Sequence, residues 1–227
     1  LDKLEIEVEI VRGSNNDFKS AVEPFFRTNM SDSSRVQSER LLHSIWDDMC
    51  AEMASSRRLS LVDFNTIADS LKVTSTDSTP SALHLIVDAK PFSNSTIVID
   101  HTGDAVLAEN IEINVGDEAQ LTIVSIQDWS EDSIHTSAHF IRLGRNARIK
   151  HIVVSLGGKT VRVVPSVEYT GPGADANLLG VYFADAGQYL EHRPFIDHSE
   201  PNCKSRVTYK GALQGTKAHT VWVGDVL

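Results

Sequence analysis

The chain has few cysteines and no long apolar run. Its two cysteines, Cys50 and Cys203, lie far apart in the sequence, so no disulfide framework is expected. Because no apolar stretch reaches the length of a membrane span, and no basic-then-apolar signal begins the sequence, we expect neither a membrane span nor a signal peptide. These absences predict a cytoplasmic protein.

Basic residues are also in short supply. The chain has 31 Asp and Glu against 21 Lys and Arg, a net charge of −10 at pH 7, which argues against a nucleic-acid partner. The glycine-rich stretch 171–175 contains a proline and is not followed by Gly-Lys-Ser/Thr, so it is not a phosphate-binding loop. A Gly-x-Ser-x-Gly nucleophile elbow is absent too.

The first part of the chain has the pattern of an α/β segment. Residues 4–11 alternate Glu with apolar residues, as a strand with one buried face does. Apolar residues three and four apart over 31–58, and a second such stretch from Ser60, predict two amphipathic helices. The Ser/Thr/Pro-rich stretch 72–82 has the composition of a linker. The sequence therefore predicts an α/β segment over 1–71, a linker over 72–82 and an all-β region over 83–227.

A short phrase recurs through this all-β region. The phrase Gly116–Leu121 recurs as Gly144–Ile149, as Gly173–Leu178 and, with a more divergent sequence, as Asn202–Val207. The step of about 28 residues is typical of stacked supersecondary units. Each copy holds a turn former, then a small residue, then an apolar residue that opens a β-branched run. Because such a unit cannot bury its apolar face alone, the pattern predicts a β-solenoid, with an all-β sandwich as the alternative.

This repeat makes a specific prediction about equivalent positions. Gly116, Gly144 and Gly173 should occupy the same corner of successive coils, and Leu121, Ile149 and Leu178 should form one row of the core. The expected strands are short and separated by glycine-marked corners. They are Leu83–Val87, Thr96–Asp100, Ile111–Val115, Gln120–Ile126, Arg148–Val154, Thr160–Val164, Leu178–Phe183, Arg206–Tyr209 and Thr220–Val223.

One stretch near the end of the chain carries a family resemblance. Residues 192–211 hold Asp-His at 197–198, Cys-x-Ser at 203–205 and Lys-Gly at 210–211, and Val-Trp-Val-Gly-Asp follows at 221–225. With these motifs, the region from about residue 80 to 227 resembles the SufB/SufD family of iron–sulfur cluster assembly proteins, and SufD most. The resemblance implies a right-handed parallel β-helix. It also implies a non-catalytic scaffold subunit that works with a SufB-like subunit and a SufC-like ATPase.

The same resemblance implies partners and a cofactor location. Members of the family continue past the position of Leu227 into more β-helix and a helical domain that docks the ATPase. We therefore expect a truncated subunit that pairs with a SufB-like subunit, or with itself, through its C-terminal coil around Trp222, and that does not bind the SufC-like ATPase. An iron–sulfur cluster is expected, if anywhere, at an interface of the complex, and no cofactor is assigned to this chain itself.

His192, His198 and Cys203 are the candidate metal ligands. Imidazole and thiolate suit metal ions and iron–sulfur clusters, but paired Cys-x-x-Cys ligands are absent, so a structural role is the alternative. The other histidines are scattered in the sequence and are interpreted as surface or coil-stacking residues. They are His43, His84, His101, His135, His139, His151 and His219.

Residues 1–75 resemble a different family. The phrases at 12–25, 29–31 and 56–60 are similar to the signal peptide peptidase A family of Ser/Lys peptidases, and Lys19 falls on the lysine of its dyad. The resemblance implies that Lys19 would act as general base on a serine. The nucleophilic serine lies outside the matching stretch, so the alternative function is an inactive peptidase fragment. The two resemblances together indicate a chimera, and a structural β-solenoid without activity is a third interpretation.

Overall fold

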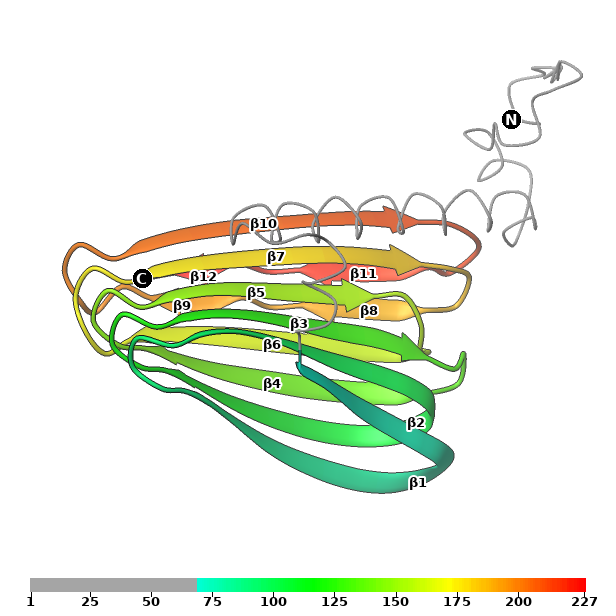
Figure 1. Ribbon diagram of the computed structural model, residues 1–227. Coiled ribbons are helices and arrows are strands. Elements are labelled where there is room, and N and C mark those ends of the chain that lie inside the picture. Colours follow the sequence, from blue (N-terminus) through cyan, green and yellow to red (C-terminus); the bar gives the residue numbers. More distant parts are fainter. Residues whose placement is uncertain (1–68) are drawn as a thin grey trace, which may run out of the picture.

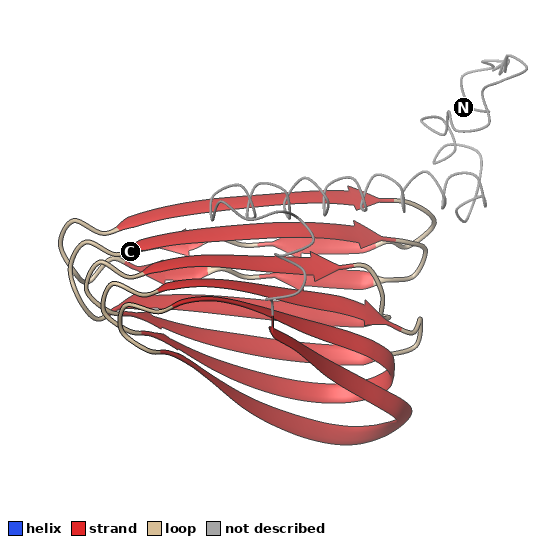
Figure 2. Ribbon diagram, viewed as in Figure 1, coloured by secondary structure: helices blue, strands red, loops and turns tan. Residues whose placement is uncertain are grey.

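The computed structural model describes residues 69–227, and these form a parallel β-solenoid (Figure 1). The strand and helices expected before Asp69 lie outside the described residues. Within them, every coil is made of strands and short connections (Figure 2). The strands are β1 (Asp69–Ala89), β2 (Asn94–Val115), β3 (Gln120–Trp129), β4 (Ile134–Leu143), β5 (Arg148–Ser155), β6 (Thr160–Tyr169), β7 (Asp175–Ala184), β8 (Tyr189–His192), β9 (Phe195–Asp197), β10 (Lys204–Leu213), β11 (His219–Trp222) and β12 (Asp225–Val226).

The strands stack into two faces that enclose one interior. The hydrogen-bonded order is β10-β7-β5-β3-β2-β4-β6-β8-β11, and every pairing is parallel. The long strand β2 bends, so its first half pairs with β3 on one face and its second half pairs with β4 on the other. The observed fold is therefore the parallel β-solenoid that the sequence repeat predicts, and the prediction of the fold class is confirmed.

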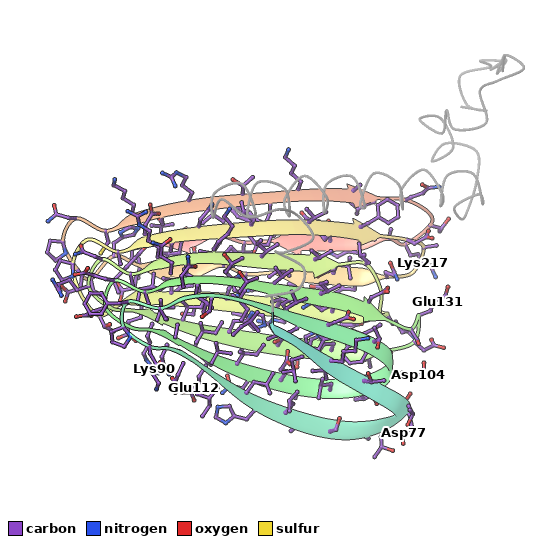
Figure 3. All side chains as sticks on the ribbon, in the orientation of Figure 1. Asp77, Lys90, Asp104, Glu112, Glu131 and Lys217 are labelled. Atoms are coloured by element: carbon purple, nitrogen blue, oxygen red, sulfur yellow. The ribbon has the colours of Figure 1, made fainter. Side chains whose placement is uncertain are left out.

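The interior is apolar near each of the two rows of corners that connect the strands. Inward residues alternate with outward ones, as in β6, where buried valines at 161, 163 and 167 are separated by more exposed residues. One buried cluster includes Ile113, Leu121 and Leu178 and lies toward one row of corners. A second includes Trp129 and Leu190 and lies toward the other row. Charged side chains such as Asp77, Asp104 and Glu131 project outward at the second row (Figure 3).

The corners before β3, β5, β7 and β10 share one backbone conformation. Each has a residue with a positive φ, a conformation that favours Gly or Asn. These residues, together with the equivalent one before β2, are Phe92 (62°), Glu118 (57°), Asn146 (54°), Gly173 (78°) and Asn202 (59°). The turn formers that the repeat singled out at 173 and 202 therefore have the positive φ expected of a corner residue, whereas Gly116 and Gly144 do not.

The register predicted for the third copy of the repeat is wrong by two residues. Gly173 is equivalent to Asn146 and not to Gly144, and Leu178 pairs with His151 and not with Ile149, which pairs with Ala176. The physical reason is that the coils differ in length.

The differences in length are found in the corners. Six residues separate Gln127 from Ile134, but four separate their partners Ser155 and Thr160. At the opposite corner, residues 116–119 connect β2 to β3, whereas the longer stretch 170–174 connects β6 to β7.

The stretch 72–82, which its composition suggests as a linker, is instead part of β1. Lys72–Thr76 and Pro80–Ala82 pair with β2, with a register shift between Thr76 and Pro80. The shift accommodates the proline, which lacks an N–H for the ladder. Ser and Thr side chains are compatible with a strand whose partner supplies the backbone hydrogen bonds.

Within residues 69–227, no helix has the length and apolar character that crossing a membrane requires.

Candidate functional site

Polar side chains fill the middle of the solenoid, between the two apolar clusters. They are inward-facing and nearly inaccessible to solvent, which is costly unless they satisfy one another. The set comprises His101, Glu109, Ser125, Gln127, His135, Ser137, His139, His151, Ser155 and His192.

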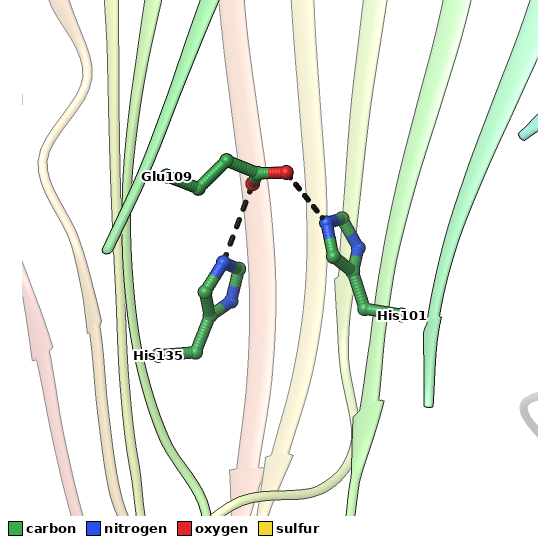
Figure 4. A group of neighbouring side chains, drawn as sticks. All are labelled: His101, Glu109 and His135. Atoms are coloured by element: carbon green, nitrogen blue, oxygen red, sulfur yellow. Dashed lines mark hydrogen bonds and ion pairs between the residues drawn. The ribbon is translucent and has the colours of Figure 1, made fainter. Parts of the chain in front are cut away.

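Three of them, His101, Glu109 and His135, meet at one point (Figure 4). Nε2 of His101 lies 2.9 Å from Oε1 of Glu109, and Nε2 of His135 lies 3.3 Å from Oε2 of Glu109. All three side chains are 0% exposed. Among the residues that the structure describes, this is the one group of three or more His, Cys, Asp or Glu side chains whose ligand atoms lie within 4.8 Å of one another.

The bend in β2 brings the three side chains together. His101 precedes the bend and Glu109 follows it, so the two lie on opposite faces and point toward each other across the interior. Gly103 makes the bend possible, because its φ is 96° and a Cβ there would collide with the backbone oxygen of Ser75. His135 enters from β4, where it pairs in register with Leu107 of β2.

The electrostatics of the cluster favour a charged glutamate. Burial by itself would raise the pKa of Glu109, but the hydrogen bond with His101 and the nearby ring of His135 hold that pKa well below its usual value. Burial lowers the pKa of His135, which disfavours a proton on that ring. The cluster therefore contains a buried carboxylate whose charge has to be balanced locally.

A chain of hydrogen bonds leads away from Glu109. The hydroxyl of Ser137 donates to Oε2 of Glu109 at 2.7 Å, so Nε2 of His139, 2.8 Å from Ser137 Oγ, must be the donor of the next bond. Nδ1 of His139 then accepts from Nε2 of His151 at 2.8 Å. Burial holds the pKa of His151 at about 4 and that of His139 well below its usual value, so both rings are neutral.

A second network runs beside the first. Ser155 donates to Oε1 of Gln127 at 2.9 Å, and Gln127 donates to Ser125 at 2.7 Å. Nε2 of His192 lies 3.1 Å from Oγ of Ser155 and donates to it. The ring of His192 stacks on Tyr182 with ring centroids 4.7 Å apart. Burial lowers the pKa of His192 to about 4, so this ring is also neutral.

The three metal ligands suggested by the sequence occupy separate environments. His192 lies in the interior at the end of β8, whereas His198 follows β9, where its Nε2 bonds Ser205 Oγ at 2.9 Å and its ring packs on Tyr169. Cys203 is a half-buried free thiol. It precedes β10 at the position that Ala174 occupies before β7, and therefore serves as the small residue of its corner. Their ligand atoms do not form a group within residues 69–227.

Lys19 lies outside the described residues. Of the scattered histidines, His101, His135, His139 and His151 fit the coil-stacking alternative and not the surface one, because stacking of the coils buries them. Nothing in the sequence indicates that they lie close together. Strand β4, which carries two of them, was not among the expected strands. Polar residues at the inward positions of β4 hide the apolar alternation that marks a strand. The signal that could have revealed the cluster is a set of polar residues at equivalent inward positions of successive coils.

Comparison with known proteins places the solenoid in a family. The family model for the SufBD core domain of the SUF system of FeS cluster assembly matches residues 72–227. An iron–sulfur cluster assembly SufBD family protein of Mycobacterium leprae is 52% identical over 150 residues, which is 63% of this chain and 38% of the relative. A protein of the same description from Mycobacterium tuberculosis H37Rv is 50% identical over the same length and with the same coverage.

A more distant SufBD family protein of M. leprae is 26% identical over 115 residues, or 51% of this chain and 13% of the relative. The chain thus spans well under half the length of these relatives, and no solved structure matches it significantly. The comparisons give no support to the peptidase resemblance of the N-terminal segment. Since the family model covers the solenoid almost from end to end, the chain belongs to the SufBD family of iron–sulfur cluster assembly proteins.

Proposed function

We propose that this chain acts in iron–sulfur cluster assembly as a non-catalytic scaffold subunit in the cytoplasm. The observation that carries the proposal is the coincidence of the family match with the solenoid: the match covers residues 72–227 and the solenoid covers 69–227. A rigid stack of parallel coils holds surface residues at fixed spacing, which suits a subunit that positions partners.

The last coil is the surface best suited to a partner. Within the described residues, β10 pairs with β7 alone and β11 pairs with β8 alone, so each presents an outer edge. Unpaired strand edges are templates for further strands. Large apolar side chains are exposed on this coil, at Leu213 (47%), Trp222 (45%) and Val226 (60%). Such an edge is completed by further coils of the same protein or by another subunit.

We propose a SufB-like subunit of the same complex, or a second copy of this chain, as the protein that docks here. Tryptophan is over-represented among the residues that dominate binding energy at interfaces. We infer that Trp222 is one of these residues, because it is 45% exposed while its ring lies tilted against that of Tyr209, at a centroid distance of 6.2 Å.

Co-purification with a tagged SufB-like subunit tests the docking surface. We expect the wild-type chain to be retained and Trp222→Lys to lose at least about tenfold in affinity, since a central aromatic residue contributes about 2 kcal/mol or more. Phe140→Lys is the matched control, because Phe140 is also 45% exposed but lies on β4 in the middle of the stack. Equal retention of both variants would remove the terminal coil as the docking surface.

The assembly role needs its own readout. Cells that depend on the SUF system and lack the corresponding subunit should recover activity of an iron–sulfur enzyme when they receive the full-length gene that contains this region, and lose it again when residues 69–227 are deleted. Full recovery with the deletion would overturn the proposed scaffold role.

A further inference from the structure

We propose that His101, Glu109 and His135 form a binding site for a divalent transition-metal ion, with Fe²⁺ or Zn²⁺ as the ion that the ligand set favours. Two imidazoles and one carboxylate are a donor set that both ions accept. The site lies inside the solenoid and is separate from the terminal coil, so the inference does not depend on the proposed docking surface.

The hydrogen-bond pattern of His101 is the first argument. Its Nδ1 lies 2.8 Å from the backbone oxygen of Ile126, and since a carbonyl can only accept, Nδ1 carries the proton. In the neutral ring Nε2 is then a bare acceptor, yet it faces a carboxylate oxygen of Glu109 at 2.9 Å. Two acceptors at that distance require a positive charge between or beside them, which is either a second proton on the ring, donated to Glu109, or a metal ion bound by both groups. Stoichiometric metal binding separates the two. Metal-bound histidines characteristically donate their other N–H to a backbone carbonyl in this manner.

The second argument comes from His135. Its ring is completely buried, and neither of its nitrogens has a hydrogen-bond partner. Nε2 points at Glu109 from 3.3 Å, as Figure 4 shows. A buried imidazole whose nitrogens make no hydrogen bond loses free energy unless its lone pair has another partner. A metal ion bound by both His135 and Glu109 would be such a partner.

The spacing of the ligand atoms agrees with a metal centre. Metal–ligand bonds of about 2.0–2.1 Å at tetrahedral angles hold neighbouring ligand atoms about 3.3 Å apart. The observed separations are 2.9 Å from Oε1 of Glu109 to Nε2 of His101 and 3.3 Å from Oε2 of Glu109 to Nε2 of His135. One ligand atom from each of the three residues lies within 4.8 Å of the other two. Trp129 packs against both rings, with centroids 5.5 Å from His101 and 5.4 Å from His135. Its apolar surface excludes water on that side, which strengthens metal–ligand attraction.

Cobalt is a suitable probe because Co²⁺ accepts the same ligands and has visible absorption. The untagged 227-residue chain is refolded from urea with Co²⁺, which lets the ion reach an enclosed site, and is then freed of excess metal. We expect one bound equivalent by elemental analysis, with the intense d–d bands of a low-symmetry site. Co²⁺ should also quench tryptophan emission, and Trp129→Phe should abolish most of that quenching because Trp129 touches two of the ligands.

Paired variants decide between a metal site and a purely structural cluster. Glu109→Gln keeps the size and can donate an amide N–H to Nε2 of His101, but it removes the charged ligand. It should weaken Co²⁺ binding by about a hundredfold or more, since even indirect partners of ligands contribute 10–100-fold. Glu112→Gln is the matched control, because Glu112 lies on the same strand but faces outward, next to exposed His84. Equal binding by these two variants, or no stoichiometric binding by the wild-type chain, would overturn the proposal.

Zinc and iron provide the last comparison. When Zn²⁺ or anaerobic Fe²⁺ is present in excess during refolding, each should reduce the Co²⁺ bound per chain, measured by elemental analysis. Zn²⁺, which has a filled d shell, should also restore tryptophan emission. Circular dichroism of each variant confirms that the solenoid has folded, so a loss of binding reports on the site itself. If Glu109→Gln does not fold, His135→Gln gives a second test, because His135 has no hydrogen bond to lose. Undiminished Co²⁺ binding by a folded His135→Gln variant would likewise overturn the site.

Discussion

Replacing His192 by glutamine should change how the stability of the solenoid depends on pH. Burial lowers the pKa of His192 from 6.5 to about 4, so between these pH values the unfolded chain binds a proton at this residue and the folded chain does not. Its contribution to the free energy of unfolding is therefore complete above pH 6.5 and is lost as the pH falls to about 4. The lowering corresponds to about 3 kcal/mol.

The variant separates this effect from the packing of the ring. Near neutral pH, His192→Gln should be about 1–2 kcal/mol less stable than wild type, because glutamine cannot stack on Tyr182. It can still donate to Ser155, the partner of Nε2 in the wild-type chain. Since glutamine takes up no proton, the difference should shrink as the pH falls and reverse by pH 4.

Urea unfolding followed by circular dichroism at a series of pH values measures both curves. The wild-type curve also contains the contributions of the other buried histidines, so only the difference between the two proteins reports on His192. His84→Gln is a control on the surface, where the contact with Glu112 is exposed and contributes less than about 1 kcal/mol. A constant gap between wild type and His192→Gln across this range would refute the reasoning, because it would mean that His192 is protonated in the folded chain.

Substitutions at four further positions test the packing of the coils. Leu178→Ala should lower the free energy of unfolding by about 2–5 kcal/mol, because Leu178 is 0% exposed and its removal leaves a cavity; a smaller loss in urea unfolding would show that the core collapses around it. Gly180→Ala should cost about 1–3 kcal/mol in the same assay, since the new Cβ would meet the ring of Tyr209, and an unchanged midpoint would show that the ring moves aside. Asn146→Val should destabilise the chain by about 1–2 kcal/mol while Asn146→Gly stays close to wild type, because φ is 54° there, so equal melting temperatures would contradict the corner conformation. Cys203→Ala should change stability by less than about 1 kcal/mol, because the equivalent corner positions hold alanine; loss of bound metal in that variant would instead support the ligand role that the sequence suggests for Cys203.

The sequence by itself determined the kind of fold, because the features that specify it are local. A turn former fits a corner with a positive φ, as Gly173 and Asn202 do, and the β-branched runs between corners have the alternation of half-buried strands. The resemblance carried by residues 192–211 agreed with the family match. None of these features needs knowledge of which coil lies on which.

Tertiary structure decided the register and the polar cluster. In the third copy the recurring phrase lies two residues beyond the structurally equivalent position, so matching the phrase misplaced Leu178, and only the strand pairing shows that His151 is its partner. His101 and His135 belong to different coils, and their rings lie 5.0 Å apart because parallel stacking places β2 against β4. Sequence distance carries no information about such neighbours. An inward polar residue looks like a break in a strand until the residue that satisfies it, on another coil, is known.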